Sequence, residues 1–256
     1  MPDRFASVPI QPIAAHDGAP LIQQAGDVVR LTLNRPAQHN RLDPADIDAM
    51  QRWLDDIARD RSIRALVITG SGSRTFSSGY TLQAILKELD ARFENLLNTL
   101  ENLPVTTIAA INGGVYGGAT DLALCCDLRI GVHGTRMFMP AARFGLHYYP
   151  DGISRYLSRL GLTAAKKLFL TAMTIEQDEM LRIGFLTDLV SADRLDAEVE
   201  RHLAALDQTD PHVVAQMKAG LNQLAERGID LSSMVAAYQA SLRSDELARR
   251  LAQLLG

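Results

Sequence analysis

Hydrophobic and polar positions along the chain follow an order that predicts strands and helices in turn. Val29, Leu31 and Leu33 alternate with polar residues, as in a strand with one buried face. The segments 64–69 and 105–111 are short apolar runs, which are typical of buried strands in a parallel sheet. Strands that alternate with helices predict right-handed crossovers, so we expect an α/β fold with a largely parallel sheet.

A helix is well marked between the first two of these strands. Asp43 suits the N-cap position, and Pro44 suits the first turn. The apolar residues that follow share one helical face, and they are Ile47, Met50, Leu54 and Ile57. Residues 93–103 predict a second helix before the strand at 105–111.

The pattern divides the chain into three regions. Residues 1–26 contain four prolines and predict an extended or mobile N-terminal arm. Residues 27–192 carry the alternating strands and helices and form the expected core. From about residue 193 the pattern is helical almost throughout, so 193–256 is expected to be a C-terminal helical region.

Composition narrows the class of protein without naming an activity. The chain has 256 residues, 47% of them hydrophobic, which is enough for a substantial core. Its formal net charge of -4 argues against a broad nucleic-acid surface. We find no secretory signal pattern and no apolar run of membrane-spanning length, so a cytoplasmic protein without membrane contact is expected. The adjacent Cys125 and Cys126 are typical of small core residues.

The segment 111–127 contains the most informative motif, which reads INGGVYGGATDLALCCD. Its glycines let the backbone turn tightly and let a ligand approach the main chain. If Gly118 opens the helix that follows, its N–H is unpaired within that helix and points outward at the positive end of the helix dipole. That geometry suits an anion or an oxyanion. Alternatively, the glycines form only a tight strand-to-helix turn.

A second segment supplies a matching donor. Residues 73–82 read SRTFSSGYTL and follow the strand at 64–69. Gly79 permits a sharp turn that leaves the N–H of Tyr80 free. Two such amides facing one another across a cleft make an oxyanion hole. We therefore expect Tyr80 and Gly118 to form the catalytic pair of donors.

With these motifs in place, the chain resembles the enoyl-CoA hydratase/isomerase, or crotonase, superfamily. The resemblance runs from about residue 27 to the C-terminus through four ordered pieces, at 33–42, 65–82, 104–130 and 143–161. It implies a spiral of β-β-α units with C-terminal helices that assemble homotrimers, often paired into homohexamers. It also implies an acyl-CoA thioester as substrate and no cofactor beyond that coenzyme A. The substrate contacts it implies are His39, Arg41, Ser78, Thr81, Leu82, Gly114, Gly117, Pro140 and Ala141.

The acids of the family pattern are only partly present. Asp121 lies one helical turn beyond Gly118, where the family usually has a glutamate that moves protons. Its alternative role is stabilisation of the first helical turn. The second family glutamate follows a proline, and the matching residue here is Ala141, which cannot exchange a proton. Two-acid hydration therefore cannot operate unchanged.

Three further side chains follow in the segment 145–155. Tyr148 falls where the related methylmalonyl-CoA decarboxylases carry an active-site tyrosine, although packing is its alternative role. Asp151 lies two positions from a site where some family members place an acid, with capping as the alternative. His147 titrates in a useful range but stands alone. The histidines show no metal-ligand spacing, so no metal site is expected.

These residues predict an enzyme, a lyase or an isomerase, that stabilises a thioester enolate between Tyr80 and Gly118 and moves protons with Asp121. One carboxylate can carry a proton between carbons, so double-bond isomerisation or an atypical hydration is favoured. Decarboxylation of a malonyl-type acyl-CoA, oriented by Tyr148, is the first alternative. A non-catalytic acyl-CoA-binding protein is the second.

Overall fold

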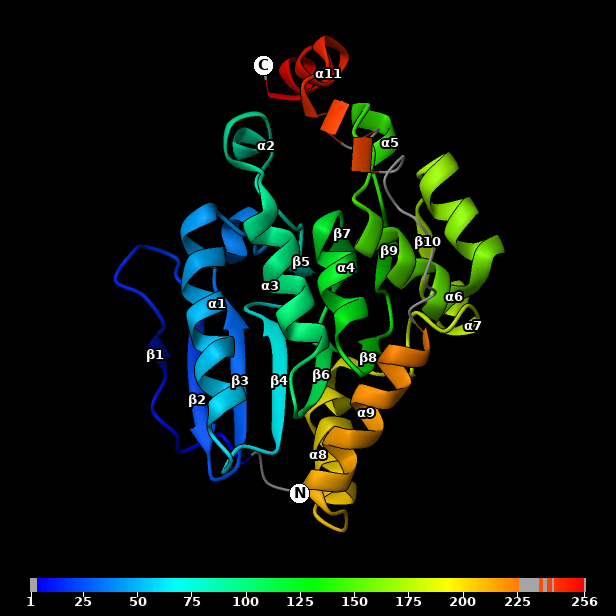
Figure 1. Ribbon diagram of the computed structural model, residues 1–256. Coiled ribbons are helices and arrows are strands. Elements are labelled where there is room, and N and C mark those ends of the chain that lie inside the picture. Colours follow the sequence, from blue (N-terminus) through cyan, green and yellow to red (C-terminus); the bar gives the residue numbers. More distant parts are fainter. Residues whose placement is uncertain (1–3, 226–234, 237–238, 241, 256) are drawn as a thin grey trace.

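The computed structural model describes residues 4–225, 235–236, 239–240 and 242–255, and its strands form two sheets (Figure 1). The larger sheet has seven strands in the order β1-β2-β3-β4-β6-β8-β11, which span Gln11–Pro12, Leu21–Ala25, Val28–Leu33, Ala65–Gly70, Thr106–Ile111, Leu128–Val132 and Asp188–Val190. The smaller sheet has the order β10-β9-β7-β5, with strands at Ile175–Glu176, Arg136–Phe138, Gly114–Tyr116 and Thr75–Ser77. From β3 to β11 the larger sheet is parallel, as predicted.

The chain repeats one unit three times: a strand in the larger sheet, a strand in the smaller sheet, and a helix. The first repeat runs β4, β5 and then α2 (Leu82–Glu88) and α3 (Ala91–Glu101). The second runs β6, β7 and α4 (Gly118–Cys125), and the third runs β8, β9 and then α5 (Ala141–Phe144) and α6 (Pro150–Thr171). This confirms the expected spiral of β-β-α units, and it brings the ends of β5 and β7 side by side.

The helix predicted after Asp43 is α1 (Pro44–Arg59), whose apolar face is buried as expected. The Asp46 carboxylate accepts a 2.8 Å hydrogen bond from the Asp43 N–H and completes the start of this helix. The helix expected at 93–103 is α3, which begins and ends two residues earlier. Asp90 caps α3 by accepting from Arg92 N, a signal that the apolar pattern alone did not reveal.

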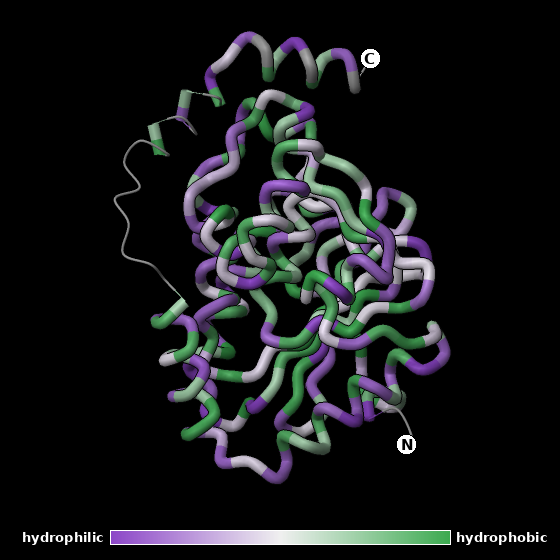
Figure 2. The backbone as a smooth tube through the Cα atoms, turned by 90° about the vertical axis from the view of Figure 1, so that its right-hand side faces the viewer, coloured by the Kyte–Doolittle hydropathy of each residue, from purple (hydrophilic) through white to green (hydrophobic). Residues whose placement is uncertain are grey.

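Alternate residues of the central strands face two different layers of helices. On one face Leu66, Ile68 and their neighbours pack against α1, α3 and α4. On the other face Ala65 and Val67 pack with Phe5 and with α8 (Leu195–Leu206). Successive side chains of a strand point to opposite faces of the sheet. Because helices cover both faces here, side chains on both faces are buried and these strands are continuous apolar runs. Hydrophobic stretches of the tube gather at the centre of the molecule (Figure 2).

The first residues form more structure than the expected arm. Residues 21–25 are strand β2, which pairs antiparallel with β3 through a turn at Gly26 and Asp27. The boundary expected at residue 26 therefore lies within a hairpin of the larger sheet. This strand is hard to predict from the sequence for two reasons. Its apolar pattern is only two residues long before two glutamines, and the prolines that precede it disfavour a strand.

The region after residue 192 is helical in its described residues. It contains η2 (Ala192–Arg194), α8, α9 (Pro211–Ala225) and α11 (Asp245–Leu255), and α7 (Gln177–Arg182) precedes it. α11 packs on α2 and α5 at one end of the molecule (Figure 1). No described helix is both long enough and apolar enough to cross a membrane.

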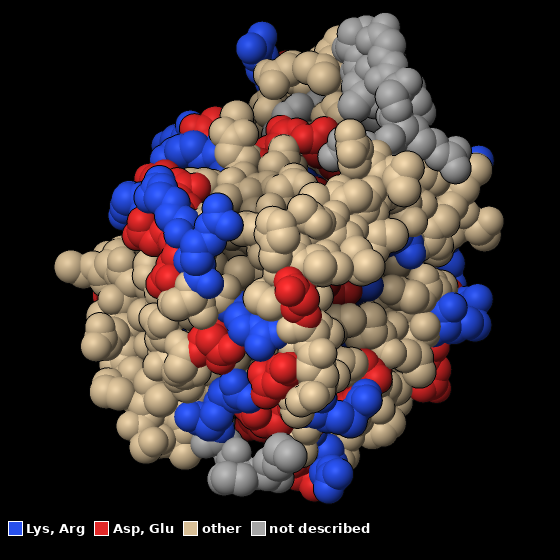
Figure 3. Space-filling view, turned by 60° about the horizontal axis from the view of Figure 1, so that its bottom comes forward, with Lys and Arg blue, Asp and Glu red and all other residues tan. Residues whose placement is uncertain are grey.

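Charged residues of both signs are mixed at the opposite end of the molecule. Figure 3 shows Lys and Arg beside Asp and Glu on this face. The described residues on this face therefore form no surface of a single charge. Elsewhere among the described residues, ion pairs such as Arg30–Asp196 and Arg59–Asp56 also join opposite charges.

Candidate active site

A cavity of about 750 Å³ opens where the ends of the smaller sheet meet α2, α3 and α5. Most of the site residues expected from the sequence line it: His39, Arg41, Ser78, Tyr80, Thr81, Leu82, Gly117, Gly118, Pro140, Ala141 and Tyr148. Gly114 and Asp121 are expected site residues that do not line it. Gly114 lies in β7, where its lack of a side chain makes room for the Tyr116 ring.

The backbone amides of Tyr80 and Gly118 converge at this cavity. Gly79 has φ +80°, and a Cβ placed on it would lie 2.6 Å from Gly118 N. A Cβ placed on Gly118 would lie 3.6 Å from Tyr80 N. In the part of the chain that the structure describes, neither N–H has a hydrogen-bond acceptor. The two donors are thus free to bind one ligand oxygen.

Flanking hydrogen bonds fix both donors. Leu42 N–H donates to Gly79 O at 2.8 Å, and Thr81 N–H donates to Leu42 O at 2.9 Å, so the backbone is held on both sides of Tyr80. Gly118 is the first residue of α4, and the preceding Gly117 N–H donates to Phe138 O at 3.0 Å. The fold therefore holds both amides in place, and a ligand oxygen could meet them without rearrangement of the backbone.

Asp121 lies in the first turn of α4, fully buried behind the cavity wall. Its Oδ2 accepts from the Tyr148 hydroxyl at 3.0 Å and from the Tyr149 hydroxyl. The Arg155 guanidinium donates to both carboxylate oxygens at 3.1 Å. The two tyrosines line the cavity, so their rings separate Asp121 from it. The role of Asp121 as a proton carrier stays a prediction, and its visible role is to anchor these side chains.

The environment of this carboxylate keeps both tyrosines protonated. Burial, reinforced by the negative charge of Asp121, raises the pKa of Tyr148 and of Tyr149 well above the ordinary value. The Tyr148 hydroxyl, expected to meet a substrate group, is turned toward Asp121. The two rings pack with centroids 4.5 Å apart and form a rigid part of the wall.

Arg155 joins α6 to α3 and α4. Besides Asp121 it binds Glu101 Oε2 at 2.7 Å and contacts Asn98 Oδ1, and its side chain is 2% exposed. Burial has the largest single effect and lowers the pKa of this guanidinium, but the surrounding negative groups, led by Asp121, together outweigh it and the net shift is upward. The cation therefore stays charged inside the protein, because it is paired.

The remaining expected side chains take structural partners. Asp151 accepts a 2.8 Å hydrogen bond from Asn98 Nδ2, and His147 Nδ1 lies 2.7 Å from the Tyr148 carbonyl oxygen. Arg41 Nε donates to Asp43 Oδ1 at 3.0 Å, and His39 Nδ1 lies 2.9 Å from Thr75 Oγ1. Arg41 and His39 still line the cavity.

Glu94, Tyr149 and Arg155 are among the residues at or behind the cavity that the sequence analysis does not single out. Glu94 lines the cavity from α3, within a segment whose path could not be read from the pattern. Tyr149 follows Tyr148 directly, and nothing in the sequence pattern distinguishes the two. Arg155 lies one helical turn beyond Asp151, a spacing that places both on one side of a helix and was available as a signal.

The start of α6 depends on a glycine that approaches this network closely. A Cβ on Gly152 would lie 2.4 Å from a Tyr148 ring carbon and 2.9 Å from Asp121 Oδ2. Gly152→Ala is therefore expected to lower the free energy of unfolding by about 1–3 kcal/mol. Gly220→Ala in α9 is the control, because no atom lies within 4 Å of its Cβ, and it should gain about 0.5–1 kcal/mol. Urea unfolding measures both; equal effects would contradict the crowding at Gly152.

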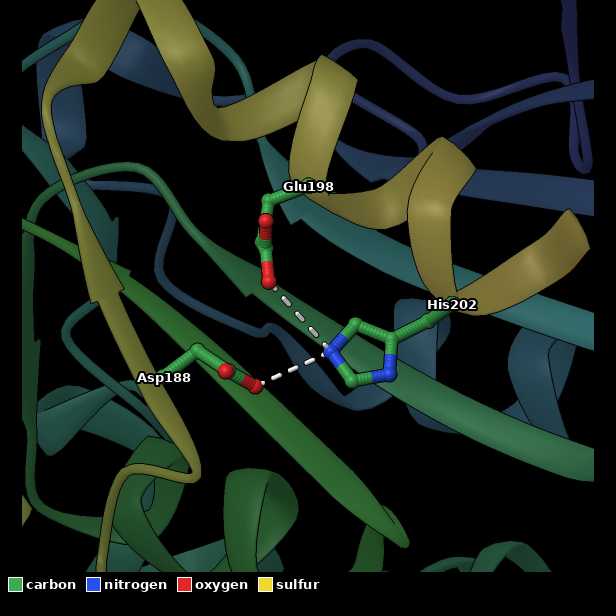
Figure 4. A group of neighbouring side chains, drawn as sticks. All are labelled: Asp188, Glu198 and His202. Atoms are coloured by element: carbon green, nitrogen blue, oxygen red, sulfur yellow. Dashed lines mark hydrogen bonds and ion pairs between the residues drawn. The ribbon is translucent and has the colours of Figure 1, made fainter. Parts of the chain in front are cut away.

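A second cluster, Asp188, Glu198 and His202, lies between β11 and α8 (Figure 4). Its ligand-type atoms lie within 4.8 Å of one another, with His202 Nε2 3.0 Å from Asp188 Oδ2. Arg201 also pairs with both carboxylates. The positive charge of the Arg201 guanidinium would repel a metal ion at this position. We therefore interpret the cluster as an ion-pair network that ties α8 to the sheet.

Comparison with known proteins gives the family. The sequence profile of the enoyl-CoA hydratase/isomerase family matches residues 23–243, which is most of the chain. The chain belongs to the enoyl-CoA hydratase/isomerase family. A short-chain-enoyl-CoA hydratase of Clostridium acetobutylicum is 28% identical over 217 residues, covering 82% of this chain and 83% of that protein.

Solved structures agree on the family fold. A methylmalonyl-CoA decarboxylase in complex with 2-nitronate-propionyl-CoA has a TM-score of 0.84 at 21% identity, covering 92% of this chain and 95% of the other. An enoyl-CoA hydratase from Mycobacterium avium subsp. paratuberculosis has a TM-score of 0.83 at 23% identity, covering 93% and 99%. At these identities the likeness establishes the crotonase fold alone. The reaction must be argued from the site of this family member.

Proposed function

We propose that this protein binds an acyl-CoA and stabilises the enolate of its thioester between the Tyr80 and Gly118 amides, with double-bond isomerisation or an atypical hydration as the net reaction. The observation that carries the proposal is the convergence of these two amides, both without an acceptor among the described residues, on one large cavity. Negative charge that develops on a thioester oxygen at this point receives two hydrogen bonds.

The cavity lining suits an acyl-CoA. Its described residues include Arg41, Arg74 and Arg136, whose charges favour the phosphate groups of coenzyme A. They also include aliphatic and aromatic side chains such as Ile85 and Leu89, which suit an acyl chain. The proposed chemistry needs no cofactor beyond the coenzyme A of the substrate.

The polar groups of the cavity favour chemistry with one acid. Ala141 occupies the wall where the resemblance places a second glutamate, and its methyl group cannot activate water. Hydration requires a proton to be taken from water and another to be delivered to carbon, whereas isomerisation carries one proton between carbons. Without an acid at position 141, the site therefore supports isomerisation better than two-acid hydration.

Decarboxylation is the second candidate, because it produces the enolate without a base. The presence of Tyr148 in the cavity wall favours it. Against this, the Tyr148 hydroxyl donates to Asp121, so it is committed to a protein acceptor. We therefore rank decarboxylation below isomerisation.

A panel of thioesters tests the proposal. Purified protein would be incubated with crotonyl-CoA, with 3-enoyl-CoAs and with methylmalonyl-CoA, and the products separated by chromatography. We expect conversion of a 3-enoyl-CoA to its conjugated isomer. Turnover of methylmalonyl-CoA alone would replace isomerisation by decarboxylation, and no turnover of any thioester, with CoA binding intact, would favour a non-catalytic binder.

Assembly into a homotrimer or homohexamer belongs to the same proposal. One face of α9 carries exposed apolar side chains, which are Val213, Met217, Leu221 and Leu224. Green hydrophobic positions recur along this helix between purple ones (Figure 2). A patch of this kind marks an interface, and a second copy of the chain is its proposed partner. The mass measured by light scattering distinguishes a monomer from these assemblies.

A further inference from the structure

Glu94 of α3 reaches the cavity beside the oxyanion hole. It lines the cavity and is half-buried. The preceding residue, Phe93, packs directly on the hole, because a Cβ placed on Gly118 would lie 2.8 Å from the Phe93 ring. Phe93 also packs edge-on against Tyr80, with ring centroids 5.5 Å apart. The turn of α3 that carries Glu94 is thus in contact with both residues that supply the amide donors.

Two other polar residues on the same face of α3 already form hydrogen bonds with α6. Asn98 and Glu101 follow Glu94 at helical spacing and share its face. Asn98 Nδ2 donates to Asp151, and Glu101 accepts from Arg155. Glu94 lies at the cavity end of this row, and within the described part of the chain its carboxylate has no hydrogen bond or ion pair. The Glu94 carboxyl group can therefore form hydrogen bonds with a ligand.

Glu94 differs in this respect from the other carboxylates near the cavity. Asp90, the second carboxylate among the described lining residues, is bound to Arg92. Asp121 lies behind the tyrosines and accepts from three donors. A group that exchanges a proton with substrate must come within hydrogen-bond reach of it. Of these three carboxylates, Glu94 meets that requirement best.

The surroundings of Glu94 favour a role in proton exchange. Burial raises the pKa of this carboxyl above the ordinary glutamate value, and the negative charges of Asp151 and Asp121 add to the effect, while Arg155 opposes it. A carboxyl whose pKa lies closer to the working pH is a better general acid and base.

We propose that Glu94 is the catalytic residue that carries a proton between the α and γ carbons of the bound acyl group. This inference rests on the proposed function, since it needs a thioester held by the Tyr80 and Gly118 amides. Asp121 then acts as a positioning residue that fixes the tyrosine wall opposite.

The proton and electron movements balance within the site. The Glu94 carboxylate takes a proton from the α carbon of a 3-enoyl thioester. The C–H electron pair forms a double bond between the α carbon and the carbonyl carbon, and the carbonyl pair moves to the oxygen held by the amides. When the oxygen pair returns to form the carbonyl, the pair between the carbonyl carbon and the α carbon moves to form a double bond between the α and β carbons. The pair of the former double bond between the β and γ carbons then takes the proton from the Glu94 carboxyl and forms the new C–H bond at the γ carbon.

The experiment compares Glu94→Gln with the wild type on a 3-enoyl-CoA. We expect kcat to fall by about 100-fold or more, with KM little changed, because glutamine keeps the shape but cannot accept the proton. Glu94→Asp should retain intermediate activity. Glu88→Gln is the matched control, because Glu88 is exposed on α2 and does not line the cavity, and it should behave as wild type.

Two further readouts separate chemistry from structure. Wild-type kcat/KM should rise with pH through a pKa above the ordinary glutamate value, because the carboxylate is the active base, and this limb should be absent in Glu94→Gln. The charged groups that act on Glu94 are Asp151 and Arg155 on α6 and Asp121 on α4, and the titratable residues that share the cavity lining with it include Asp90, Tyr148 and Tyr149. Wild type should also exchange the α hydrogens of a saturated acyl-CoA in deuterium oxide, and the variant should not.

The results of these experiments distinguish failure of the role of Glu94 from failure of the proposed function. Wild-type turnover with Glu94→Gln within about threefold of it would overturn the role of Glu94 and leave the proposed function standing. No wild-type turnover of 3-enoyl-CoA and no α-hydrogen exchange would overturn both. Unchanged affinity of Glu94→Gln for a saturated acyl-CoA, which we expect, shows that the variant is folded.

Discussion

Gly79→Ala is expected to reduce kcat by about 100- to 1,000-fold, the usual effect of losing one donor of an oxyanion hole. The added methyl group would lie 2.6 Å from Gly118 N and 2.8 Å from Ala119 N, which is closer than real Cβ atoms approach backbone. Either the two amides move apart to make room for the methyl group, or the methyl group occupies the space between them. Steady-state kinetics on the thioester turned over by the wild type measures the effect.

Gly26→Ala is the matched control for backbone strain. Gly26 also has a positive φ, of +64°, but no atom lies within 4 Å of its Cβ. Both substitutions cost about 1–2 kcal/mol of stability through the left-handed backbone, while Gly26 is in the distant β2–β3 turn. Gly26→Ala should keep wild-type kcat. If Gly79→Ala also kept it, the hole would not be the site of catalysis.

Arg155→Met is expected to lower the free energy of unfolding by about 3–5 kcal/mol, because it leaves the buried Asp121 charge without its cation. Asp121 is fully buried, and the tyrosine hydroxyls alone cannot neutralise it. Adding Asp121→Asn to Arg155→Met should recover part of the loss, since the uncompensated charge is then removed. Urea unfolding at one fixed protein concentration measures both variants.

Arg182→Met provides the comparison with an exposed ion pair. Arg182 binds Glu179 at 3.1 Å, but its side chain is 71% exposed. Such pairs contribute about 0–1 kcal/mol, so this variant should unfold nearly as the wild type does. Equal losses for Arg155→Met and Arg182→Met would show that the buried network does not hold α6 in place.

Much of the fold could be predicted because its signals are local. The apolar runs at 64–69 and 105–111 and the helix start at Asp43 depend on spacing and on side-chain type, and the structure contains each element. β2 was missed because it depends on pairing with β3, and its own residues give only a weak strand pattern. The strands of the smaller sheet are implied only by the family resemblance, because strands of two or three residues are too short to predict from the hydrophobic pattern.

The backbone part of the site could be predicted more fully than its side chains. Glycine-rich turns such as those at Gly79 and Gly118 indicate where amides are freed, whatever lies around them. Asp121 could be placed in the first turn of its helix, but its partners are Arg155 of α6 and the two tyrosines just before that helix, about thirty residues away, and spacing does not reveal them. Glu94 reads as an ordinary surface glutamate until α3 is placed against the cavity.

The carbonyl stretch of a bound thioester tests the central claim most directly. A saturated acyl-CoA labelled with carbon-13 at the thioester carbonyl would be bound to the wild type and to Gly79→Ala, and infrared difference spectra recorded. Two hydrogen bonds from the Tyr80 and Gly118 amides polarise the carbonyl, so we expect a lower stretching frequency on the wild type than in water, and a smaller shift on the variant. A wild-type frequency equal to that in water, with the acyl-CoA shown to be bound, would contradict the account.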